Sequence, residues 1–218
     1  MQFLYRQAPL EQNLEIDGDE FRYLCKVRRI QVGEFVNISN FEDLKIYEYE
    51  VVHIDKKKIS LAMRSSTKVE QNLPFLHIGW CMVDPKTIEK TLPFLNELGV
   101  AKITFIYCKK SQRNFKLNFE RMQKILINSC QQCGRGNLMQ LESCDSIEEF
   151  ILQNPNAHIC DFGGEKIASH NIQTIIVGPE GGLSECEQNL NLAKIGFDTP
   201  LILRSETAVT AIASKILV

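Results

Sequence analysis

The 218-residue sequence has no long apolar run, no cluster of histidines and no large excess of either charge. No stretch approaches the roughly 18 consecutive apolar residues of a membrane-spanning helix. The segment MQFLYRQAPLEQ at the start contains neither an apolar signal core nor a small-residue cleavage site. We therefore expect no membrane partner, no export and a cytoplasmic location. The composition, 44% hydrophobic and 24% charged, is that of a chain able to form a packed core.

The eight cysteines do not follow a metal-binding or disulfide pattern. Cys130 and Cys133 form a C-x-x-C pair, but a zinc site would need a second pair or histidines at ligand spacing, and the four histidines are scattered. Four other cysteines lie in or beside apolar runs, where a free thiol packs as a small hydrophobic group. The sequence thus predicts reduced thiols and no metal.

The net charge of −2 is unevenly distributed. Residues 101–135 contain eight Lys or Arg against one acidic residue, a balance of +7, whereas residues 136–200 contain two basic and ten acidic residues, a balance of −8. A basic segment in a near-neutral protein is typical of a face that contacts phosphates. A solvated helix face balanced by its acidic neighbour explains the charge pattern equally well, so charge alone leaves both interpretations open.

Residues 1–70 have the pattern of a small, β-rich domain of barrel type. Three segments rich in β-branched and aromatic residues predict strands: 35–39, 45–54 and 57–63. The exception is EFRYLCKVRRI (20–30), where basic residues recur three and four apart and predict a short helix. The polar segment 66–74 ends in proline and predicts a linker.

From residue 71 onward, apolar strand-like segments alternate with helical ones. Strands are predicted at 75–83, 100–108, 158–162, 174–178 and 201–204. Helices are predicted at 87–99 and 119–134, each ending at a glycine, after the strand at 174–178, and at 207–218. This alternation predicts an α/β domain over 71–218, with a mostly parallel sheet covered on both faces.

The segment TIIVGPEGGLSECE (174–187) predicts a strand, a glycine-rich turn and a helix start. Ser184 and Glu187 form a capping box, so the helix should begin at Ser184. The spacing matches neither the dinucleotide-binding nor the P-loop pattern. Glu180 would repel a polyphosphate but tolerate a sulfonium cation. Taken alone, such a turn is more often a tight connection than a ligand-binding loop.

The segment LILRSETAVTAIASKIL (201–217) is the second notable feature. Ser205 is a plausible helix N-cap, and Glu206 favours the positive end of the helix. Helix formation does not explain why Arg204 stands at the end of an apolar segment, directly before the helix.

These two segments resemble the signature motifs of the ribosomal RNA small subunit methyltransferase E family, which belongs to the knotted SPOUT class. IIVGPEGGLSECE (175–187) is similar to the family pattern GPEGG(F/L)S-x-x-E, and LILRSETAVTAI (201–212) is similar to LR(T/S)ETA. Further resemblances lie upstream: NELGVAKITFI (96–106), RMQKILINSCQQCGR (121–135) and, in the RNA-binding region, GDEFRYLCKVRRIQVGE (18–34). The resemblance therefore covers most of the chain.

The resemblance implies transfer of a methyl group from S-adenosylmethionine to N3 of a uridine in 16S ribosomal RNA of the small subunit. It implies a PUA-like β-barrel at 1–70, a SPOUT-type sheet with a C-terminal trefoil knot at 71–218, and a homodimer. The implied catalytic residues are Arg204 and Glu206. The implied cofactor-binding residues are Phe162, Gly163, Val177, Gly178, Pro179, Glu180, Gly181, Gly182, Leu183, Leu203, Ser205, Thr207 and Ala208. The candidate RNA-binding residues are Arg22, Lys26, Arg28, Arg29, Lys110, Arg113 and Arg135.

The chain departs from the family pattern at four places. Arg22-Tyr23 replaces a His pair, and Phe94, next to an unusual Pro93, replaces a basic residue. Lys110-Ser111 replaces Arg-Ser, and Thr199-Pro200-Leu201 replaces Gly-x-Arg. The Phe94 and Leu201 differences concern individual RNA or cofactor contacts and leave the resemblance intact. Two rival functions remain: methylation of a ribose 2′-hydroxyl or another base by the same fold, and RNA binding without catalysis.

The final helix suggests how the homodimer is held together. Residues 207–218 are apolar on more than one face, which is more apolar surface than a single packing contact needs. Surplus apolar surface usually finds a partner, so this helix is predicted to contribute to the subunit interface.

Overall fold

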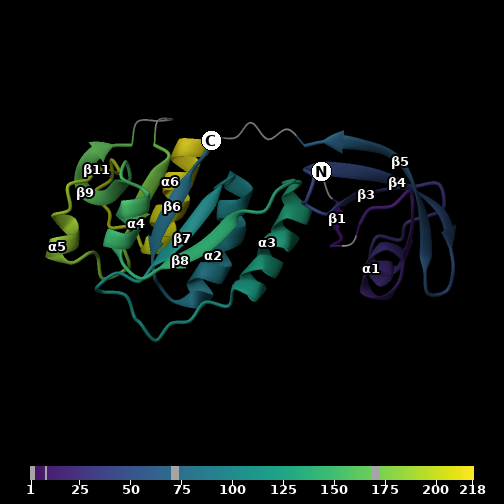
Figure 1. Ribbon diagram of the computed structural model, residues 1–218, viewed down its shortest axis with the longest axis horizontal. Helices are drawn as coiled ribbons and strands as arrows, with labels where there is room; N and C mark the ends of the chain where they lie inside the picture. The colour runs from purple at the N-terminus through teal and green to yellow at the C-terminus, as the bar shows by residue number, and fades with distance from the viewer. Residues whose placement is uncertain (1–2, 8, 70–73, 168–171) are drawn as a thin grey trace. The chain divides into compact units, whose positions relative to one another are not determined.

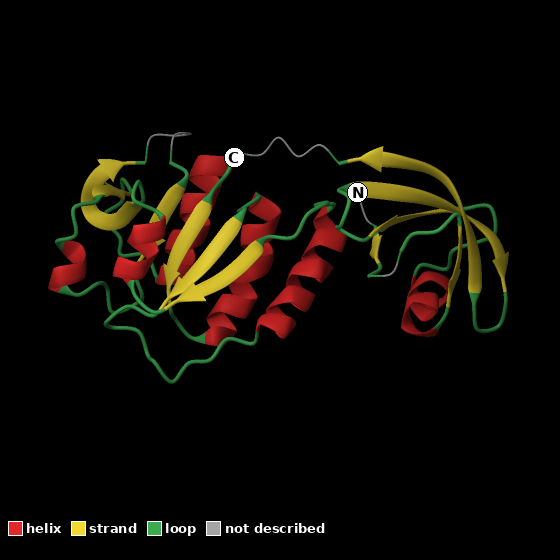
Figure 2. Cartoon of the chain, viewed as in Figure 1, coloured by secondary structure: helices red, strands yellow, loops and turns green. Residues whose placement is uncertain are grey.

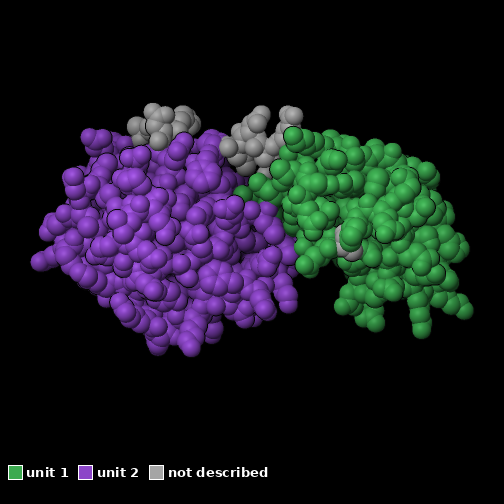
Figure 3. All heavy atoms as spheres, viewed as in Figure 1, with its two compact units in different colours: residues 1–71, 130–137 green, residues 72–129, 138–218 purple. Residues whose placement is uncertain are grey.

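The computed structural model describes residues 3–7, 9–69, 74–167 and 172–218. The chain forms two compact units, coloured separately in Figure 3: residues 1–71 with 130–137, and residues 72–129 with 138–218. We call them unit 1 and unit 2.

Unit 1 is built on a five-stranded sheet in the order β1-β3-β4-β5-β2. Figure 1 labels β1, β3, β4 and β5 of this sheet. Its strands are β1 (Leu4–Tyr5), β2 (Asn13–Ile16), β3 (Phe35–Ser39), β4 (Lys45–Ile54) and β5 (Ile59–Lys68). β1 pairs parallel with β3, and the other pairs are antiparallel. Val36 and Ile38 of β3 are fully buried, as the alternation of a half-buried strand requires.

The predicted helix of unit 1 is present as two short pieces. α1 (Gly18–Arg22) continues into η1 (Tyr23–Val27), a π-helical turn. Both pieces bury side chains in the core of the sheet, through Phe21 and Leu24. Two predicted strands have the expected bounds, and the third begins and ends later than predicted, because β5 continues to Lys68. The predicted linker, 66–74, thus starts inside β5, and its positions 70–73 lie outside the described residues.

Unit 2 contains a six-stranded sheet in the order β11-β9-β10-β6-β7-β8. Its strands are β6 (His77–Cys81), β7 (Lys102–Ile106), β8 (Gln140–Cys144), β9 (His158–Lys166), β10 (Thr174–Val177) and β11 (Ala193–Gly196). All neighbouring strands pair parallel. The helices are α2 (Pro85–Leu98), α3 (Phe119–Cys133), α4 (Ile147–Gln153), α5 (Glu185–Gln188) and α6 (Ser205–Leu217). The α/β class with a parallel sheet is therefore confirmed.

The sheet of unit 2 is covered on both faces (Figure 2). Ile175 and Val177 of β10 pack in one core with residues of α2, α3 and α6, whereas Ile176 packs in a second core with Ile147 and Phe150 of α4. Alternate side chains of a strand point to opposite faces, so both faces must be apolar. All five residues of β6 are buried for this reason.

Helix α2 shows how local sequence sets the ends of an element. Asp84 accepts a hydrogen bond from the backbone N–H of Lys86, and Pro85 occupies the first turn, where no amide donor is needed. Gly99 ends the helix with φ of 95°, a left-handed conformation that favours glycine. The glycine stop predicted from the sequence is confirmed.

The strand prediction at 201–204 is wrong. These residues form an irregular segment in which Leu201 and Ile202 are 69% and 82% exposed, so their apolar character does not come from a place in the sheet. The prediction that Ser205 is the N-cap of the last helix is also wrong, since Arg204 occupies that position. Five elements that the sequence did not predict are present: β1, β2, β8, α4 and β11.

Helix α6 buries its apolar side chains within its own chain. Ala208, Val209, Ile212, Ala213 and Ile216 are at most 8% exposed and pack in the core shared with α2 and β10. The interpretation of these residues as surplus surface for a subunit interface is therefore wrong, because the core accounts for them.

All eight cysteines are free thiols, with Cys81, Cys108 and Cys130 buried. Within the described ranges, no three His, Cys, Asp or Glu side chains are grouped so that they would bind a metal ion. Over the same ranges, no helix has the length and apolar character to span a membrane.

Candidate cofactor cavity

A cavity of about 420 Å³ opens beside the carboxyl end of β10. Three chain segments form its walls: residues 160–162 of β9, residues 177–183 from the last residue of β10 onward, and residues 202–205 up to the first residue of α6. Gln188 and Ala208 complete the lining. Ligands of open parallel sheets bind at the carboxyl ends of strands. The cavity combines two of the segments that the sequence singled out, although residues 188–200 separate them in the sequence.

The β9 wall arises from an irregularity in the sheet. Lys194 of β11 pairs with Ile159, but the next residue, Ile195, pairs with Glu165, so residues 160–164 bulge out of the ladder. A β-bulge redirects the side chains of its strand, and this one turns residues 160–162 toward the cavity. Gly196 is required at this point, because a Cβ atom there would lie 2.6 Å from the carbonyl oxygen of Asp161.

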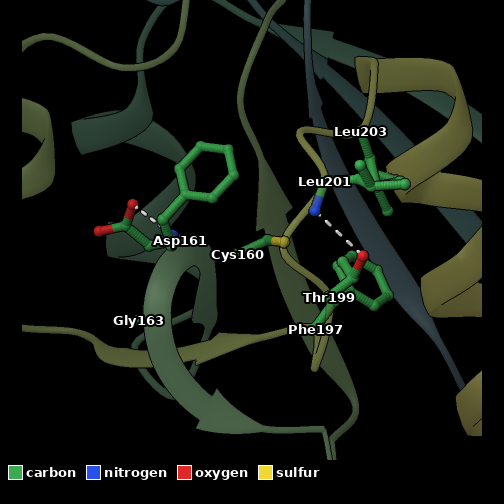
Figure 4. A pocket seen from close by; sticks show the side chains of 9 residues that line it. Cys160, Asp161, Gly163, Phe197, Thr199, Leu201 and Leu203 are labelled. Carbon is green, nitrogen blue, oxygen red and sulfur yellow. Dashed lines mark hydrogen bonds between the residues drawn. The ribbon is translucent and has the colours of Figure 1, made fainter.

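A smaller hollow of about 110 Å³ adjoins the cavity (Figure 4). The two share the lining residues Cys160, Asp161, Phe162, Leu203 and Ala208. Gly163, Phe197, Thr199 and Leu201 complete the smaller one. The backbone N–H of Leu201 donates to Thr199 Oγ1 at 3.2 Å, which holds this turn in place.

The glycine-rich loop ends in the predicted capping box. Ser184 accepts from the backbone N–H of Glu187, and the Glu187 carboxylate accepts from the backbone N–H of Ser184 at 2.8 Å. Glu187 Oε1 also accepts from the backbone N–H of Lys109 at 2.8 Å. Burial raises the pKa of the Glu187 carboxyl, but the hydrogen bonds from Ser184 and the backbone amides outweigh burial and hold the pKa below its ordinary value. The carboxylate thus ties the loop after β7 to the start of α5.

Ser205 connects two walls of the cavity. Its hydroxyl oxygen accepts from the indole N–H of Trp80 at 2.8 Å and its hydroxyl donates to the carbonyl oxygen of Gly178 at 2.7 Å. Both Trp80 and Ser205 are buried. From the sequence, Ser205 was predicted to cap the helix and to bind the cofactor. Trp80 had no predicted role, because its contact with Ser205 spans 125 residues.

The two predicted catalytic residues differ in their relation to the cavity. The side chain of Arg204 lines it and is 81% exposed, and that of Glu206 is 26% exposed and does not line it. Arg204 Nη1 and Glu206 Oε1 are 4.0 Å apart. Glu206 Oε2 is buried and has no hydrogen-bond partner among the described residues.

The structure brings together nearly all predicted cofactor-binding residues. All of them line the cavity or the smaller hollow except Thr207, which is exposed on α6. Seven lining residues were not predicted from the sequence: Cys160, Asp161, Gln188, Phe197, Thr199, Leu201 and Ile202. For Leu201 a signal existed, since it departs from the family pattern.

The charges on the cavity wall favour a cation with apolar parts over a polyanion. Arg204 is the sole Lys or Arg among the lining residues that the structure describes, whereas Glu180 and Asp161 supply carboxylates. Asp161 Oδ2 is paired with Lys194 at 2.9 Å, so Glu180 is the more available anion. Apolar surface comes from Val177, Leu183, Ile202, Leu203 and the exposed ring of Phe162.

The predicted RNA-binding residues differ in accessibility. Arg22, Lys26, Arg28 and Arg29 are exposed on unit 1, and Arg113 is exposed in the loop after β7. Lys110 is also exposed, but its ammonium donates to the carbonyl oxygen of Gly181 at 3.1 Å and so touches the glycine-rich loop. Arg135 is only 6% exposed, and its Nε donates to Asn137 Oδ1 at 2.9 Å. Because Arg135 is buried, the RNA interface proposed below does not include it.

Comparison with known proteins places the chain in a family. The family model of the RNA methyltransferase domain matches residues 70–217, and that of the RNA methyltransferase PUA domain matches residues 16–63. The chain is 38% identical to the ribosomal RNA small subunit methyltransferase E of Helicobacter pylori strain J99, over 98% of both chains. It is 29% identical to the protein of the same name from Aquifex aeolicus, over 87% of both chains.

The fold is similar to that of a solved structure. The ribosomal RNA small subunit methyltransferase E of Neisseria gonorrhoeae, crystallised with S-adenosyl methionine, superimposes with a TM-score of 0.76 at 21% identity, over 98% of this chain and 95% of that one. Since the domain model covers most of the chain and the Helicobacter relative is aligned almost end to end, the chain belongs to the ribosomal RNA small subunit methyltransferase E family.

Proposed function

We propose that this protein transfers a methyl group from S-adenosylmethionine to N3 of a specific uridine in the 16S RNA of the small ribosomal subunit. The observation that carries the proposal is the cavity at the carboxyl end of β10, built from the family's two signature segments. Family membership supports the reaction class, and the chemistry of the cavity wall supports the methyl donor.

The cavity suits S-adenosylmethionine in size and in charge. Its volume of about 420 Å³ lies within the range of sites for ligands of this class, about 300–1,000 Å³. Leu183, Leu203 and Ile202 offer apolar surface to an adenine ring, and Glu180 offers a carboxylate to a cationic group. Gly178, Gly181 and Gly182 leave backbone groups open to hydrogen bonds. When bound, S-adenosylmethionine supplies an electrophilic methyl group on a sulfonium ion.

The residues of the chain would then prepare the uracil. N3 of uridine carries a proton at neutral pH and becomes a good nucleophile only when that proton leaves. Arg204, exposed at the cavity edge, would stabilise the negative charge that develops on the uracil carbonyl oxygens. Glu206 is proposed to accept the proton, because its Oε2 lacks a hydrogen-bond partner. The new bond joins N3 to the methyl carbon as the bond from carbon to sulfur breaks.

The exposed basic residues of both units are proposed to contact RNA phosphates. They are Arg22, Lys26, Arg28 and Arg29 in unit 1 and Lys110 and Arg113 in unit 2. Phosphate contacts fix the register of a protein on its nucleic acid. Two separate groups of contacts suit a large folded target, so we propose the assembled small subunit as the substrate. A short uridine-containing oligonucleotide methylated as fast as intact subunits would refute this preference.

We also propose the finer features of the family's architecture. Unit 1 would be a PUA-like barrel over 1–70, and 71–218 a SPOUT domain in which the segment before α6 completes a trefoil knot, an exception to the unknotted rule. That segment runs from the edge strand β11 to α6, which packs against α2 and against the inner strand β10. A crystal structure that traces residues 158–218 without a threaded loop would remove the knot.

A cytoplasmic homodimer is the last part of the proposal. Apolar side chains are exposed beside the cavity, with Phe162 at 76%, Leu201 at 69% and Ile202 at 82%, and a second subunit would cover them. Sedimentation equilibrium tests the dimer directly. A monomer at tens of micromolar would contradict it.

Methylation of purified small subunits tests the proposed reaction. Subunits from a strain lacking this protein are incubated with the protein and S-adenosylmethionine labelled in its methyl group, and the RNA is digested to nucleosides. The label is expected in 3-methyluridine. Label in a 2′-O-methyl nucleoside or in another base would replace the proposal with a related methyltransferase. Absence of label, with RNA bound, would indicate an RNA-binding module.

A further inference from the structure

Trp80 does not line the cavity, but it is hydrogen-bonded to Ser205, which does. Trp80 lies in β6, the central strand between β10 and β7, and is fully buried. Its indole N–H donates to Ser205 Oγ at 2.8 Å, and Ser205 in turn donates to the carbonyl oxygen of Gly178 at 2.7 Å. Ser205 and Gly178 both line the cavity, on segments that face each other.

The direction of this chain of hydrogen bonds is fixed by its first member. An indole N–H donates and cannot accept, whereas a hydroxyl has one proton and two lone pairs. With the indole occupying one lone pair of Ser205, the hydroxyl proton is free to point at Gly178. Trp80 thus selects the hydroxyl orientation that joins the start of α6 to the end of β10.

The hydroxyl of Ser205 makes this contact and does not cap the start of α6. A serine at a helix start often caps the exposed backbone amides, yet α6 has no side-chain cap, and its N-cap position is Arg204. The hydroxyl points inward instead and is 4% exposed. The buried indole N–H would otherwise lack a partner, which is costly in a protein interior.

We propose that Trp80 is a positioning residue for the methyl donor: acting through Ser205, it sets the distance between the 178–183 and 202–205 walls of the cavity. This inference rests on the proposed function, because the ligand is S-adenosylmethionine. It assigns no contact between Trp80 and the ligand, and no part in the chemical step.

Calorimetric titration with S-adenosylmethionine tests the proposal in a double-mutant cycle. Trp80→Phe removes the donor and keeps an aromatic ring, and Ser205→Ala removes the intermediate. Each should weaken binding by about 2- to 12-fold, the range expected for loss of one net hydrogen bond. The double variant should bind no more weakly than Ser205→Ala alone, because Trp80 acts through Ser205. Ser205→Thr keeps the hydroxyl and should retain most of the affinity.

Phe105→Leu is the matched control. Phe105 packs beside Trp80 with ring centroids 6.2 Å apart in the same core, but it makes no hydrogen bond to the cavity. This variant should lower the melting temperature and leave the affinity for S-adenosylmethionine unchanged. In turnover assays, Trp80→Phe should raise the KM for S-adenosylmethionine while the KM for the RNA substrate stays constant.

Wild-type affinity in Trp80→Phe, or losses that add in the double variant, would overturn the proposal. If Trp80→Phe does not fold, Ser205→Ala and Ser205→Thr still decide whether the hydroxyl matters to binding, and equal affinity in these two would overturn it. Failure of the wild-type protein to bind S-adenosylmethionine would instead refute the proposed function, so the two failures are distinguishable.

Discussion

At the scale of single residues, Gly181 and Gly182 of the cavity loop differ in what a side chain would meet. A Cβ atom on Gly181 has Lys110 Cδ as its nearest neighbour at 4.0 Å, so the protein itself tolerates one. Gly182 has φ of +68°, which strains a branched side chain whatever the space. Only the first position therefore tests ligand binding without disturbing the backbone.

We predict that Gly181→Val weakens S-adenosylmethionine binding at least tenfold, because the side chain enters the cavity, while the melting temperature stays within a few degrees of wild type. Gly181→Ala should give a smaller loss. Gly182→Val should reduce both affinity and stability, by about 1–3 kcal/mol for the strained backbone. Calorimetry and thermal unfolding measure the two effects, and wild-type affinity in Gly181→Val would show that the ligand lies elsewhere.

His77 gives a second prediction at this scale, for the pH dependence of stability. It is 3% exposed and hydrogen-bonded to Thr104 Oγ1 at 2.7 Å. Burial, followed by the nearby charge of Lys102, lowers the pKa of His77 from 6.5 to about 4. The unfolded chain therefore binds a proton that the folded chain refuses, and stability is lost as pH falls from 6.5 toward 4.

This linkage predicts a loss of about 2 kcal/mol in the free energy of unfolding between pH 7 and pH 5. His77→Gln keeps a donor toward Thr104 but cannot titrate, so it should lose less stability over the same interval. Urea unfolding at the two pH values measures the difference. An equal loss of unfolding free energy in the wild type and in His77→Gln would mean that His77 does not contribute to the acid sensitivity.

At the scale of elements, the N-terminal cap of α5 supports both stability and the cavity. Ser184 and Glu187 form a capping box, and Glu187 also binds the backbone N–H of Lys109. We predict that Ser184→Ala costs about 1 kcal/mol of stability, the usual value of such a cap, and also weakens S-adenosylmethionine binding. The loop before α5 lines the cavity, so loosening its end widens the site.

Ser146 provides the matched control for this prediction. It caps α4 by accepting from the backbone N–H of Glu149 at 3.1 Å, and it does not line the cavity. Ser146→Ala should cost a similar amount of stability and leave ligand affinity unchanged. Equal affinity for S-adenosylmethionine in Ser184→Ala and Ser146→Ala would show that the cap of α5 does not affect ligand binding.

The elements that the sequence predicted well are those whose pattern is local. Apolar runs mark the strands β6, β7 and β10. Helix α2 has helical periodicity and clear caps at both ends. The segment 201–204 was wrongly predicted to be a strand. Its apolar residues Leu201 and Ile202 are exposed beside the cavity and do not pack in the sheet. In β8, apolar and polar residues alternate only weakly, and the strand lies at the sheet edge. For α4 a local signal for a helix start was present in Ser146 and Glu149 but was not used.

Only part of the cavity lining could be predicted from the sequence. The family motifs contain the 178–183 and 203–208 segments, but the β9 bulge that supplies Cys160 and Asp161 depends on its register against β11. The contact between Trp80 and Ser205 spans 125 residues, and no spacing rule detects it. Tertiary pairing overrode the capping preference that the sequence assigned to Ser205.

At the scale of the whole molecule, RNA binding should depend on separate groups of exposed cations. Arg113 and Lys116 are exposed in the loop after β7. Among the described residues neither side chain makes a hydrogen bond to the cavity loop, unlike Lys110, so we add Lys116 to the proposed RNA contacts. We predict that Arg113→Glu with Lys116→Glu weakens binding to small subunits and lowers the slope of log affinity against log salt by about 1.5, since two phosphate contacts no longer release counterions. Affinity for S-adenosylmethionine should not change.

Lys86→Glu with Lys90→Glu is the control for total charge, because these lysines are exposed on α2 and carry the same charge change. Filter binding at several salt concentrations should show a wild-type slope for this control. The same slope in the Arg113 and Lys116 variant would move the RNA interface away from the loop after β7.

The most direct test of the central claim is mass spectrometry of nucleosides from the 16S RNA of a strain in which this chain is deleted. We predict that 3-methyluridine disappears, returns when the wild-type chain is supplied, and does not return with Gly181→Val. An unchanged amount of 3-methyluridine in the deletion strain would contradict the proposed function.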